Sequence, residues 1–176
     1  MRDAVIVSTA RTPIGKAYRG AFNATLSPTL AAHSIRAAVE RAKIDPAEVD
    51  DVVYGAALLQ GGQHTIGRTA ALRAGLPVTV AGMSMDRQCS SGLMSIATAA
   101  KQVIVDRMDV VVAGGVESIS TVQTKEMRVQ PDPDLVAMHK NIYMPMLQTA
   151  EVVAKRYDIG RDRQDAYGYQ SQMRTA

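Results

Sequence analysis

The chain has 176 residues, of which 47% are hydrophobic and 21% are charged, and these fractions are typical of a soluble globular domain. Its length suits one domain, or one domain with part of a second. The 20 basic and 17 acidic residues give a net charge of +3 and are dispersed along the chain, which argues against a nucleic-acid partner. This charge is compatible with an anionic small ligand.

The chain contains one cysteine, Cys89, so no disulfide can form within it. This composition argues against a secreted disulfide scaffold and favours a cytoplasmic protein. Met1, Arg2 and Asp3 lead into an apolar run at residues 4–7, which is too short for a signal peptide and has an acid in front of it. No apolar run approaches the ~20 residues that cross a bilayer, so we expect no membrane contact.

Strands and helices alternate through the first part of the chain. Short runs rich in β-branched and apolar residues predict strands at residues 4–8, 51–57, 78–85 and 109–113. Ser27 followed by Pro28 marks a helix start, and small or apolar residues recur at helical spacing as far as Ala42. Similar signals predict a single turn at residues 45–48 and helices at residues 65–74 and 90–105.

The resulting order βαβαβαβ favours a layered α/β/α domain with a largely parallel sheet. A loop with Pro13, Gly15 and Gly20 separates the first expected strand from the first expected helix. The helix expected at residues 90–105 is apolar or small on nearly all sides, which is typical of a buried helix.

The composition changes after Ser120. Residues 123–148 contain Pro131, Pro133 and Pro145 together with several methionines, and they lack a strand period. Helical spacing returns at residues 149–157 and 161–174. We therefore expect an α/β domain at residues 1–120 and the beginning of a separate subdomain at residues 121–176.

Cys89 stands between an expected strand and the N-terminus of an expected helix. The unpaired N–H groups and the dipole of a helix start favour a thiolate there, and the thiolate is the nucleophilic form of cysteine. The same N–H groups can hold the oxyanion that forms when a thioester carbonyl is attacked. On position alone, a free cysteine is more often a small buried hydrophobe than a nucleophile, so both interpretations stay open.

A nucleophilic cysteine usually needs a base, and the chain offers His33, His64 and His139. None of them stands at a spacing that fixes it near Cys89. One cysteine and three scattered histidines also argue against a metal site. The glycine pairs at 61–62 and 114–115 match neither a dinucleotide fingerprint nor a P-loop, so we interpret them as turns.

The stretch at residues 86–93, Asp-Arg-Gln-Cys-Ser-Ser-Gly-Leu, resembles the active-site cysteine signature of the thiolase family. Four further stretches resemble thiolases in the same order along the chain. They are residues 10–15 (ARTPIG), 113–120 (AGGVESIS), 149–151 (TAE), and 163–165 (RQD) with 171–172 (SQ). Because the matches extend along the whole chain, the resemblance selects Cys89 as the nucleophile.

The resemblance implies an acyl-CoA acyltransferase that cleaves a 3-ketoacyl-CoA with coenzyme A or condenses two acyl-CoA molecules. Cys89 would carry the acyl group as a thioester, and its backbone N–H would contribute to an oxyanion hole. Thiolases have two similar α/β halves, with a loop domain inserted in the first half that covers the coenzyme A site. Residues 121–176 would begin that loop domain. The family further implies a homodimer or homotetramer, coenzyme A as substrate and no tightly bound cofactor.

The sequence departs from the family at several positions. Asp86 stands where asparagine is frequent, and Leu147 stands where a glycine commonly follows the methionine at Met146. We expect Met146 and Leu147 to contact substrate, with Leu147 crowding the acyl or pantetheine path. Pro145 replaces a histidine found in some acetoacetyl-CoA-forming members, which favours a degradative thiolase.

Thiolases are much longer than this chain, and their activating histidine and second cysteine lie in the second half of the family sequence. We therefore expect this chain to lack the last strand of its own half, to need a C-terminal half as partner and to be incompetent alone. Two alternatives stay open. One is a condensing enzyme of the wider thiolase superfamily, and the other is a catalytically incomplete fragment or binding module.

Overall fold

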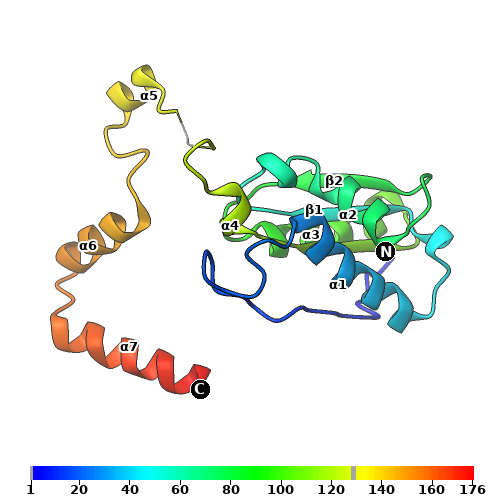
Figure 1. Cartoon of the computed structure of the whole chain (residues 1–176), viewed down its shortest axis with the longest axis horizontal. Coiled ribbons are helices and arrows are strands. Elements are labelled where there is room, and N and C mark those ends of the chain that lie inside the picture. The colour runs from blue at the N-terminus through cyan, green and yellow to red at the C-terminus, as the bar shows by residue number, and fades with distance from the viewer. Residues whose placement is uncertain (1, 128–129) are drawn as a thin grey trace. The chain divides into compact units, whose positions relative to one another are not determined.

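The computed structural model describes residues 2–127 and 130–176 (Figure 1). The chain divides into two compact units, residues 1–128 and residues 129–176. The first unit carries the sheet and Cys89, whereas the described part of the second contains helices as its only regular elements. The domain boundary expected at residue 120 stays a prediction.

A parallel sheet forms the centre of the first unit. Its strands, in the order β2-β1-β3, are β1 (Asp51–Gly55), β2 (Ala81–Met85) and β3 (Val111–Gly115). All five residues of the central strand β1 are buried. In register, Gly55 faces Met85 on one side and Gly115 on the other, so the three strands end level. The parallel sheet with its helices confirms the expected α/β class.

Two helices, α1 (Ser27–Ala42) and α2 (Ile66–Ala74), pack together on one face of the sheet. The small apolar stripe that predicts α1 is buried, and Ile35 at its centre is 1% exposed. Alternate side chains of β1 point to these helices, because side chains in a strand alternate between faces. This arrangement builds the core, whose members include Ala31, Ile35, Val39, Val52, Tyr54, Ile66, Ala70 and Ala71.

A third helix, α3 (Ser91–Lys101), covers the other face and contacts β1 and β3. The hydroxyl of Ser95, which is fully buried, lies 2.6 Å from the carbonyl oxygen of Gly114 and so ties α3 to β3. After α3 the chain makes a π-helical turn at Gln102–Asp106, where the Gln102 amide donates to the Asp51 carboxylate (2.7 Å).

The expectation that this helix is buried on all sides is wrong. Leu93 is 72% exposed and Ile96 is 42% exposed. The sheet covers only one side of α3, and within the described residues nothing buries the side that carries Leu93. Burial of that side therefore needs a further layer of protein.

The strand expected at residues 4–8 is also absent from the part of the chain that the structure describes. Val5, Ile6 and Val7 are each about 75% exposed. A strand is stable only when a neighbour pairs with its N–H and C=O groups, and no strand in residues 2–127 or 130–176 pairs with this segment. The apolar, β-branched run correctly indicates a segment suited to pairing, but pairing also requires a partner in register.

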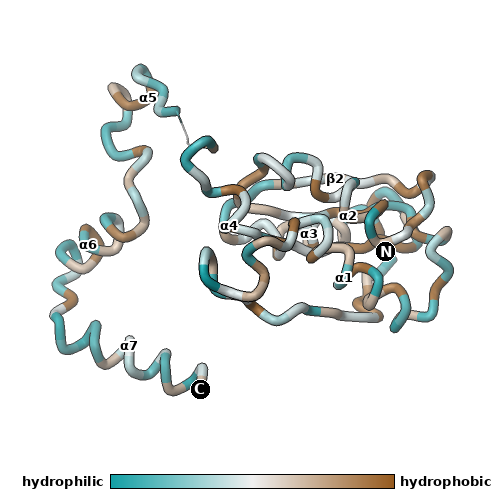
Figure 2. Tube along the Cα trace, viewed as in Figure 1, coloured by the Kyte–Doolittle hydropathy of each residue, from teal (hydrophilic) through white to brown (hydrophobic). Residues whose placement is uncertain are grey.

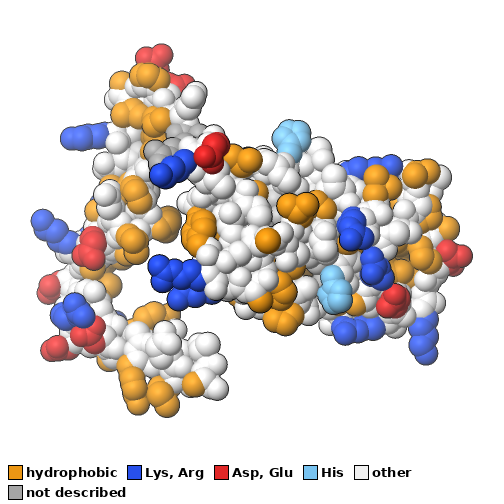
Figure 3. Space-filling model, viewed as in Figure 1, with side chains coloured by type: hydrophobic (Ala, Val, Ile, Leu, Met, Phe, Trp, Pro, Cys, Tyr) orange, Lys and Arg blue, Asp and Glu red, His pale blue; other side chains and the backbone are white. Residues whose placement is uncertain are grey.

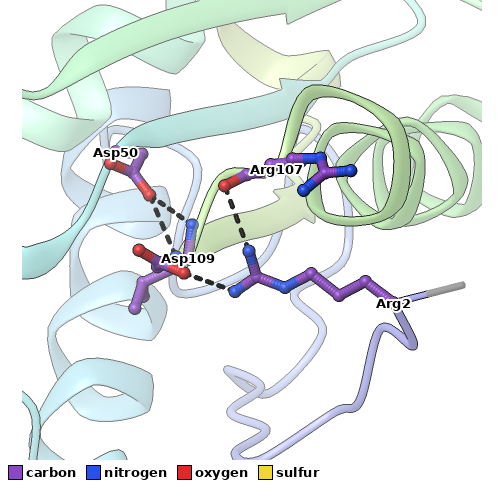
Figure 4. A network of polar contacts seen from close by, with 5 residues as sticks. Arg2, Asp50, Arg107 and Asp109 are labelled. Carbon is purple, nitrogen blue, oxygen red and sulfur yellow. Dashed lines mark hydrogen bonds and ion pairs between the residues drawn. The ribbon is translucent and has the colours of Figure 1, made fainter.

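The start of this segment is fixed by charged side chains instead (Figure 4). The Arg2 guanidinium donates to the carbonyl oxygen of Arg107 (3.1 Å) and also pairs with the Asp109 carboxylate. The Asp50 carboxylate accepts from the N–H groups of Asp109 (2.8 Å) and Val110 (3.0 Å). These contacts join the amino ends of β1 and β3, whereas Cys89 lies at the carboxyl ends of the strands.

Hydrogen bonds just before β2 and β3 explain why these two strands begin later than expected. β2 begins at Ala81 rather than Val78, because the preceding residues form a turn in which the N–H of Val80 donates to the carbonyl oxygen of Pro77 (3.1 Å). The Arg68 guanidinium also donates to the carbonyl oxygens of Val78 (3.0 Å) and Val80. The run expected at residues 109–113 becomes β3 at Val111–Gly115, since Asp50 occupies the N–H groups just before it. A side chain that captures a backbone group delays the start of a ladder.

Short helices complete the first unit: the 3₁₀ turns η1 (Pro46–Glu48) and η2 (Gly61–Gln63), and the short α4 (Ile119–Val122). The expected turn at residues 45–48 is confirmed. Its cap is Asp45, whose carboxylate accepts from the N–H of Ala47 (2.9 Å).

The second unit contains α5 (Pro133–Met138), α6 (Met146–Arg156) and α7 (Arg161–Thr175). α5 lies in the stretch in which the sequence shows no strand period, and the Asp132 carboxylate caps it by accepting from the N–H of Leu135 (3.0 Å). α6 begins earlier than the expected residue 149, directly after Pro145. Figure 2 shows hydrophobic and hydrophilic positions alternating along α6, and Figure 3 shows exposed hydrophobic side chains among the charged ones of this unit.

Among the described residues, no helix combines the length and the apolar character needed to cross a membrane.

Replacing Ile35 by alanine in this chain should lower the free energy of unfolding by about 2–5 kcal/mol, because the substitution leaves a cavity in the core. Ile6→Ala is the matched control. Since Ile6 is 75% exposed, its loss should change the free energy by less than about 0.5 kcal/mol. Urea unfolding followed by circular dichroism measures both. Equal losses would show that Ile6 is packed in solution.

Candidate active site

Cys89 is exposed and lies in the turn between the end of β2 and the start of α3. This turn stands at the carboxyl ends of the parallel strands, which is where open α/β sheets bind their ligands. Gln88, immediately before the cysteine, has a positive φ of 50°. A left-handed residue there turns the chain sharply and brings Cys89 to the surface.

Hydrogen bonds within the turn hold Cys89 in place. The Ser91 hydroxyl accepts from the N–H of Arg87 (2.8 Å) and donates to the carbonyl oxygen of Gln88 (2.6 Å). The Asp86 carboxylate accepts from the N–H of Gln88 (2.6 Å). An asparagine carbonyl oxygen could accept the same bond, so Asp86 fills that role in this chain without changing the contact.

Glycines let α3 lie close against the ends of the strands. A Cβ on Gly55 would lie 2.4 Å from the carbonyl carbon of Ser91, and one on Gly115 would lie 2.9 Å from the Cα of Gly92. Neither space can hold a side chain, because the neighbouring atoms belong to the backbone. The first turn of α3 therefore rests directly on the ends of β1 and β3.

Ser90, the N-cap residue of α3, makes no capping hydrogen bond through its side chain. The first turn of a helix carries N–H groups without intrahelical partners and partial positive charge. An anion or an oxyanion beside Cys89 would therefore meet a favourable field. The geometry supplies the setting that the sequence predicts for a cysteine nucleophile.

A wide hollow of about 1410 Å³ opens beside Cys89 along the free edge of β3, and we call it the β3-edge hollow. It is lined by residues 4–17, by parts of α1 and α3, by β3 and by residues 116–120. Of the described residues that line it, Glu117 is the only acid, whereas Arg11, Lys16 and Arg41 are basic. The hollow separates the N-terminal segment from the unpaired edge of β3.

Tyr54 closes part of the floor of this hollow. Its phenol is 3% exposed and lies 2.8 Å from the Ser34 hydroxyl. Burial raises the pKa of Tyr54, and the hydrogen bond with Ser34 offsets part of that rise. Tyr54 is therefore neutral near pH 7 and acts as a packing residue with a satisfied hydroxyl.

The three histidines do not gather at Cys89. His33 is exposed on α1, His64 is exposed after η2, and His139 is exposed in the second unit. None of them lines the β3-edge hollow in the described residues. Nor do the described residues contain a group of three His, Cys, Asp or Glu side chains arranged to hold a metal ion.

Met146 and Leu147 form the first residues of α6 in the second unit, where they are 77% and 85% exposed. Their contact with substrate stays a prediction. Sequence reasoning missed Gln63 and Glu117, which lie in the polar contacts beside the ends of β1 and β3. Gln63 follows a glycine pair and resembles an ordinary loop residue. Glu117 lies in the family-like stretch at residues 113–120, but that stretch does not by itself indicate which groups the side chain contacts.

A parallel α/β unit with an exposed cysteine at a helix N-terminus offers a setting that favours a thiolate and can stabilise an oxyanion. The model of the thiolase N-terminal domain matches residues 4–176, and the chain therefore belongs to the thiolase family.

Relatives support the same assignment along the whole chain. A 3-ketoacyl-CoA thiolase of Bacillus subtilis is 38% identical over 177 residues, which cover 100% of this chain and 45% of that protein. A β-ketoadipyl-CoA thiolase of Acinetobacter baylyi is 38% identical over 196 residues, covering 100% of this chain and 48% of the relative. A peroxisomal 3-ketoacyl-CoA thiolase of Candida tropicalis is 36% identical.

The crystal structure of the Bacillus anthracis acetyl-CoA acetyltransferase superposes with a TM-score of 0.78 at 34% identity, over 94% of this chain and 45% of that one. The chain thus spans about half the length of the relatives that it matches. The similarity confirms the expected fold and family.

Replacing Ser91 by alanine should lower the free energy of unfolding by about 1–2 kcal/mol, because Arg87 N–H and Gln88 C=O lose their partner. Ser90→Ala is the matched control, since the exposed Ser90 hydroxyl makes one contact, to the Arg87 carbonyl oxygen (2.9 Å). Ser90→Ala should lower the free energy of unfolding by about 0.5 kcal/mol or less. Urea unfolding compares the two, and a larger loss in Ser90→Ala would contradict this description of the turn.

Proposed function

We propose that this protein is an acyl-CoA acyltransferase of the thiolase type, which works through an acyl-thioester on Cys89. One observation carries the proposal: Cys89 is exposed at the N-terminus of α3, at the carboxyl ends of the strands, beside an open hollow. Family membership and the activities after which the relatives are named support the same chemistry.

In the first half-reaction the Cys89 thiolate attacks the thioester carbonyl of an acyl-CoA. The electron pair of the C=O bond moves to oxygen, and the backbone N–H of Cys89 stabilises that oxyanion. The carbonyl re-forms as coenzyme A leaves as a thiolate, which takes a proton. These steps begin the condensation direction, in whose second half-reaction the carbanion of a second acyl-CoA attacks the acyl-thioester, a C–C bond forms and the Cys89 thiolate leaves, which gives ping-pong kinetics.

In the thiolysis direction the Cys89 thiolate instead attacks the 3-keto carbonyl of a 3-ketoacyl-CoA, the C2–C3 bond breaks and the acyl-CoA carbanion that leaves takes a proton. The thiolate of coenzyme A then attacks the acyl-thioester and releases Cys89.

The remaining machinery is proposed to come from the part of the family sequence that this chain does not span. That part would supply the histidine that activates Cys89 and the second cysteine that exchanges protons with the substrate. Residues 121–176 would begin the loop domain over coenzyme A, with Met146 and Leu147 against the acyl or pantetheine chain. Coenzyme A thioesters would serve as substrates, with no tightly bound cofactor.

We further propose a homodimer or homotetramer, as the family resemblance implies. The absence of disulfides favours a cytoplasmic location, although relatives of this chain include peroxisomal thiolases.

The protein in its full family length, with this chain as the N-terminal part, should gain one acetyl group when incubated with acetyl-CoA. Denaturing intact-mass spectrometry followed by peptide mapping should place the adduct on Cys89. Cys89→Ser should show no thioester adduct and no thiolysis of acetoacetyl-CoA, because the serine hydroxyl is a far weaker nucleophile than a thiolate. Acetylation elsewhere, or thiolysis by Cys89→Ser, would contradict the proposal.

A further inference from the structure

We infer that Gln63 and Glu117 form a positioning pair that sets the reactivity of Cys89 by holding together the ends of β1 and β3 beneath α3. The inference rests on the proposed function only in taking Cys89 as the nucleophile. It concerns how the cysteine is placed, which is measurable without any acyl-CoA.

Gln63 uses every hydrogen-bonding position of its side chain although it is fully buried. Its amide nitrogen donates to the carbonyl oxygen of Leu58 (2.8 Å) and to the Glu117 carboxylate (2.6 Å). Its amide oxygen accepts from the Ser27 hydroxyl (2.8 Å) and from the N–H of Ser118 (2.8 Å). Gln63 thus joins the start of α1, the loop after β1 and the loop after β3.

Glu117 continues the sheet one residue beyond its end. The ladder finishes with the N–H of Ala56 on the Met85 carbonyl oxygen (3.1 Å) and the N–H of Val116 on the Gly55 carbonyl oxygen (3.0 Å). The next N–H, that of Ala57, bonds to the Glu117 carboxylate (2.6 Å). Beyond the last backbone hydrogen bond between β1 and β3, the Glu117 carboxylate accepts the N–H in place of a backbone carbonyl oxygen.

Both oxygens of Glu117 therefore accept an N–H, one from Ala57 and one from Gln63. This arrangement suits a side chain that holds the backbone in place, because an N–H donor engages each carboxylate oxygen. Bonds to a carboxylate are the stronger kind, so the pair can resist separation of the two strand ends.

A shift of the carboxyl ends of β1 and β3 would displace Cys89, because Gly55 and Gly115 contact the first turn of α3. Gly55 touches Ser91, and Gly115 touches Gly92, at distances where no side chain fits. Ser91 in turn holds the backbone of Arg87 and Gln88 on the other side of the cysteine. A change in the spacing of β1 and β3 must therefore shift the turn that carries Cys89.

Swapping the two side chains tests the pair by a double-mutant cycle. Glu117→Gln leaves one acceptor oxygen for two N–H donors, and Gln63→Glu removes both donors and places two carboxylates together. The double variant restores one amide donor facing one carboxylate. Each single variant should react with iodoacetamide at Cys89 about tenfold more slowly, because the turn is displaced from the helix N-terminus. The double variant should recover most of that rate.

Asp50→Asn is the matched control. Asp50 also joins β1 to β3 through a carboxylate that accepts two backbone N–H groups, but at the opposite edge of the sheet. The Asp50→Asn variant should be less stable than the parent protein, but its Cys89 should be alkylated at the same rate. Glu117→Asp, which keeps the charge and shortens the reach, replaces Glu117→Gln if that variant does not fold, and it should slow alkylation in the same way.

Unchanged alkylation of Cys89 in folded single variants would overturn the inference. So would an equal slowing in Asp50→Asn, because a general loss of stability would then explain the effect, and so would a double variant slower than both singles. Failure of the proposed function gives a different result. Cys89 would then react with iodoacetamide as described here, while acetyl-CoA would leave no adduct on it.

Discussion

The close contact between the first turn of α3 and the ends of β1 and β3 is the constraint on which the rest of this unit depends. Three glycines, at positions 55, 92 and 115, meet there with backbone against backbone. A helix normally keeps a layer of side chains between itself and a sheet. Without that layer, the N-terminus of α3 and the cysteine in front of it are fixed by the sheet itself.

The constraint acts at the carboxyl ends of the strands, whereas separate charged contacts hold the amino ends together. At the carboxyl edge, it presents Cys89 to the β3-edge hollow with a sharp turn at Gln88 and with Ser91 holding the turn from within. At the amino edge, Asp50 and Arg2 join the strands and the N-terminal segment through charged contacts (Figure 4). The turn that carries Cys89 is thus held between a strand and a helix, and regular elements maintain precise placement more easily than loops do.

Much of this could be predicted from the sequence, because the signals are local. The stripe of α1, the cap at Asp45 and the position of Cys89 before α3 all follow from short-range patterns, and the structure contains each of them. The strand limits could not be predicted as well. Arg68 and Asp50 capture backbone groups just before β2 and β3, and a pattern of apolar residues does not register such long-range contacts.

The remaining differences share one physical cause. The run at residues 4–8 has the composition of a strand, and α3 has the composition of a buried helix, yet Ile6 and Leu93 are mostly exposed. An apolar composition shows that a segment is suited to burial, but the segment is buried only where another part of the protein covers it. Gln63 illustrates the opposite limit: a loop glutamine carries no signal in the sequence, and its four contacts come together only in the folded chain.

The stability of Gly55→Ala, compared with that of Gly62→Ala, tests the central constraint most directly. An added Cβ at Gly55 would meet the backbone of Ser91, whereas nothing lies within 4 Å of one at Gly62. In urea unfolding, Gly55→Ala should lower the free energy of unfolding by at least about 2 kcal/mol, because the backbone of α3 must shift. Gly62→Ala should change the free energy of unfolding by no more than about 0.5 kcal/mol. Equal stability of the two variants would contradict the direct contact between α3 and the sheet.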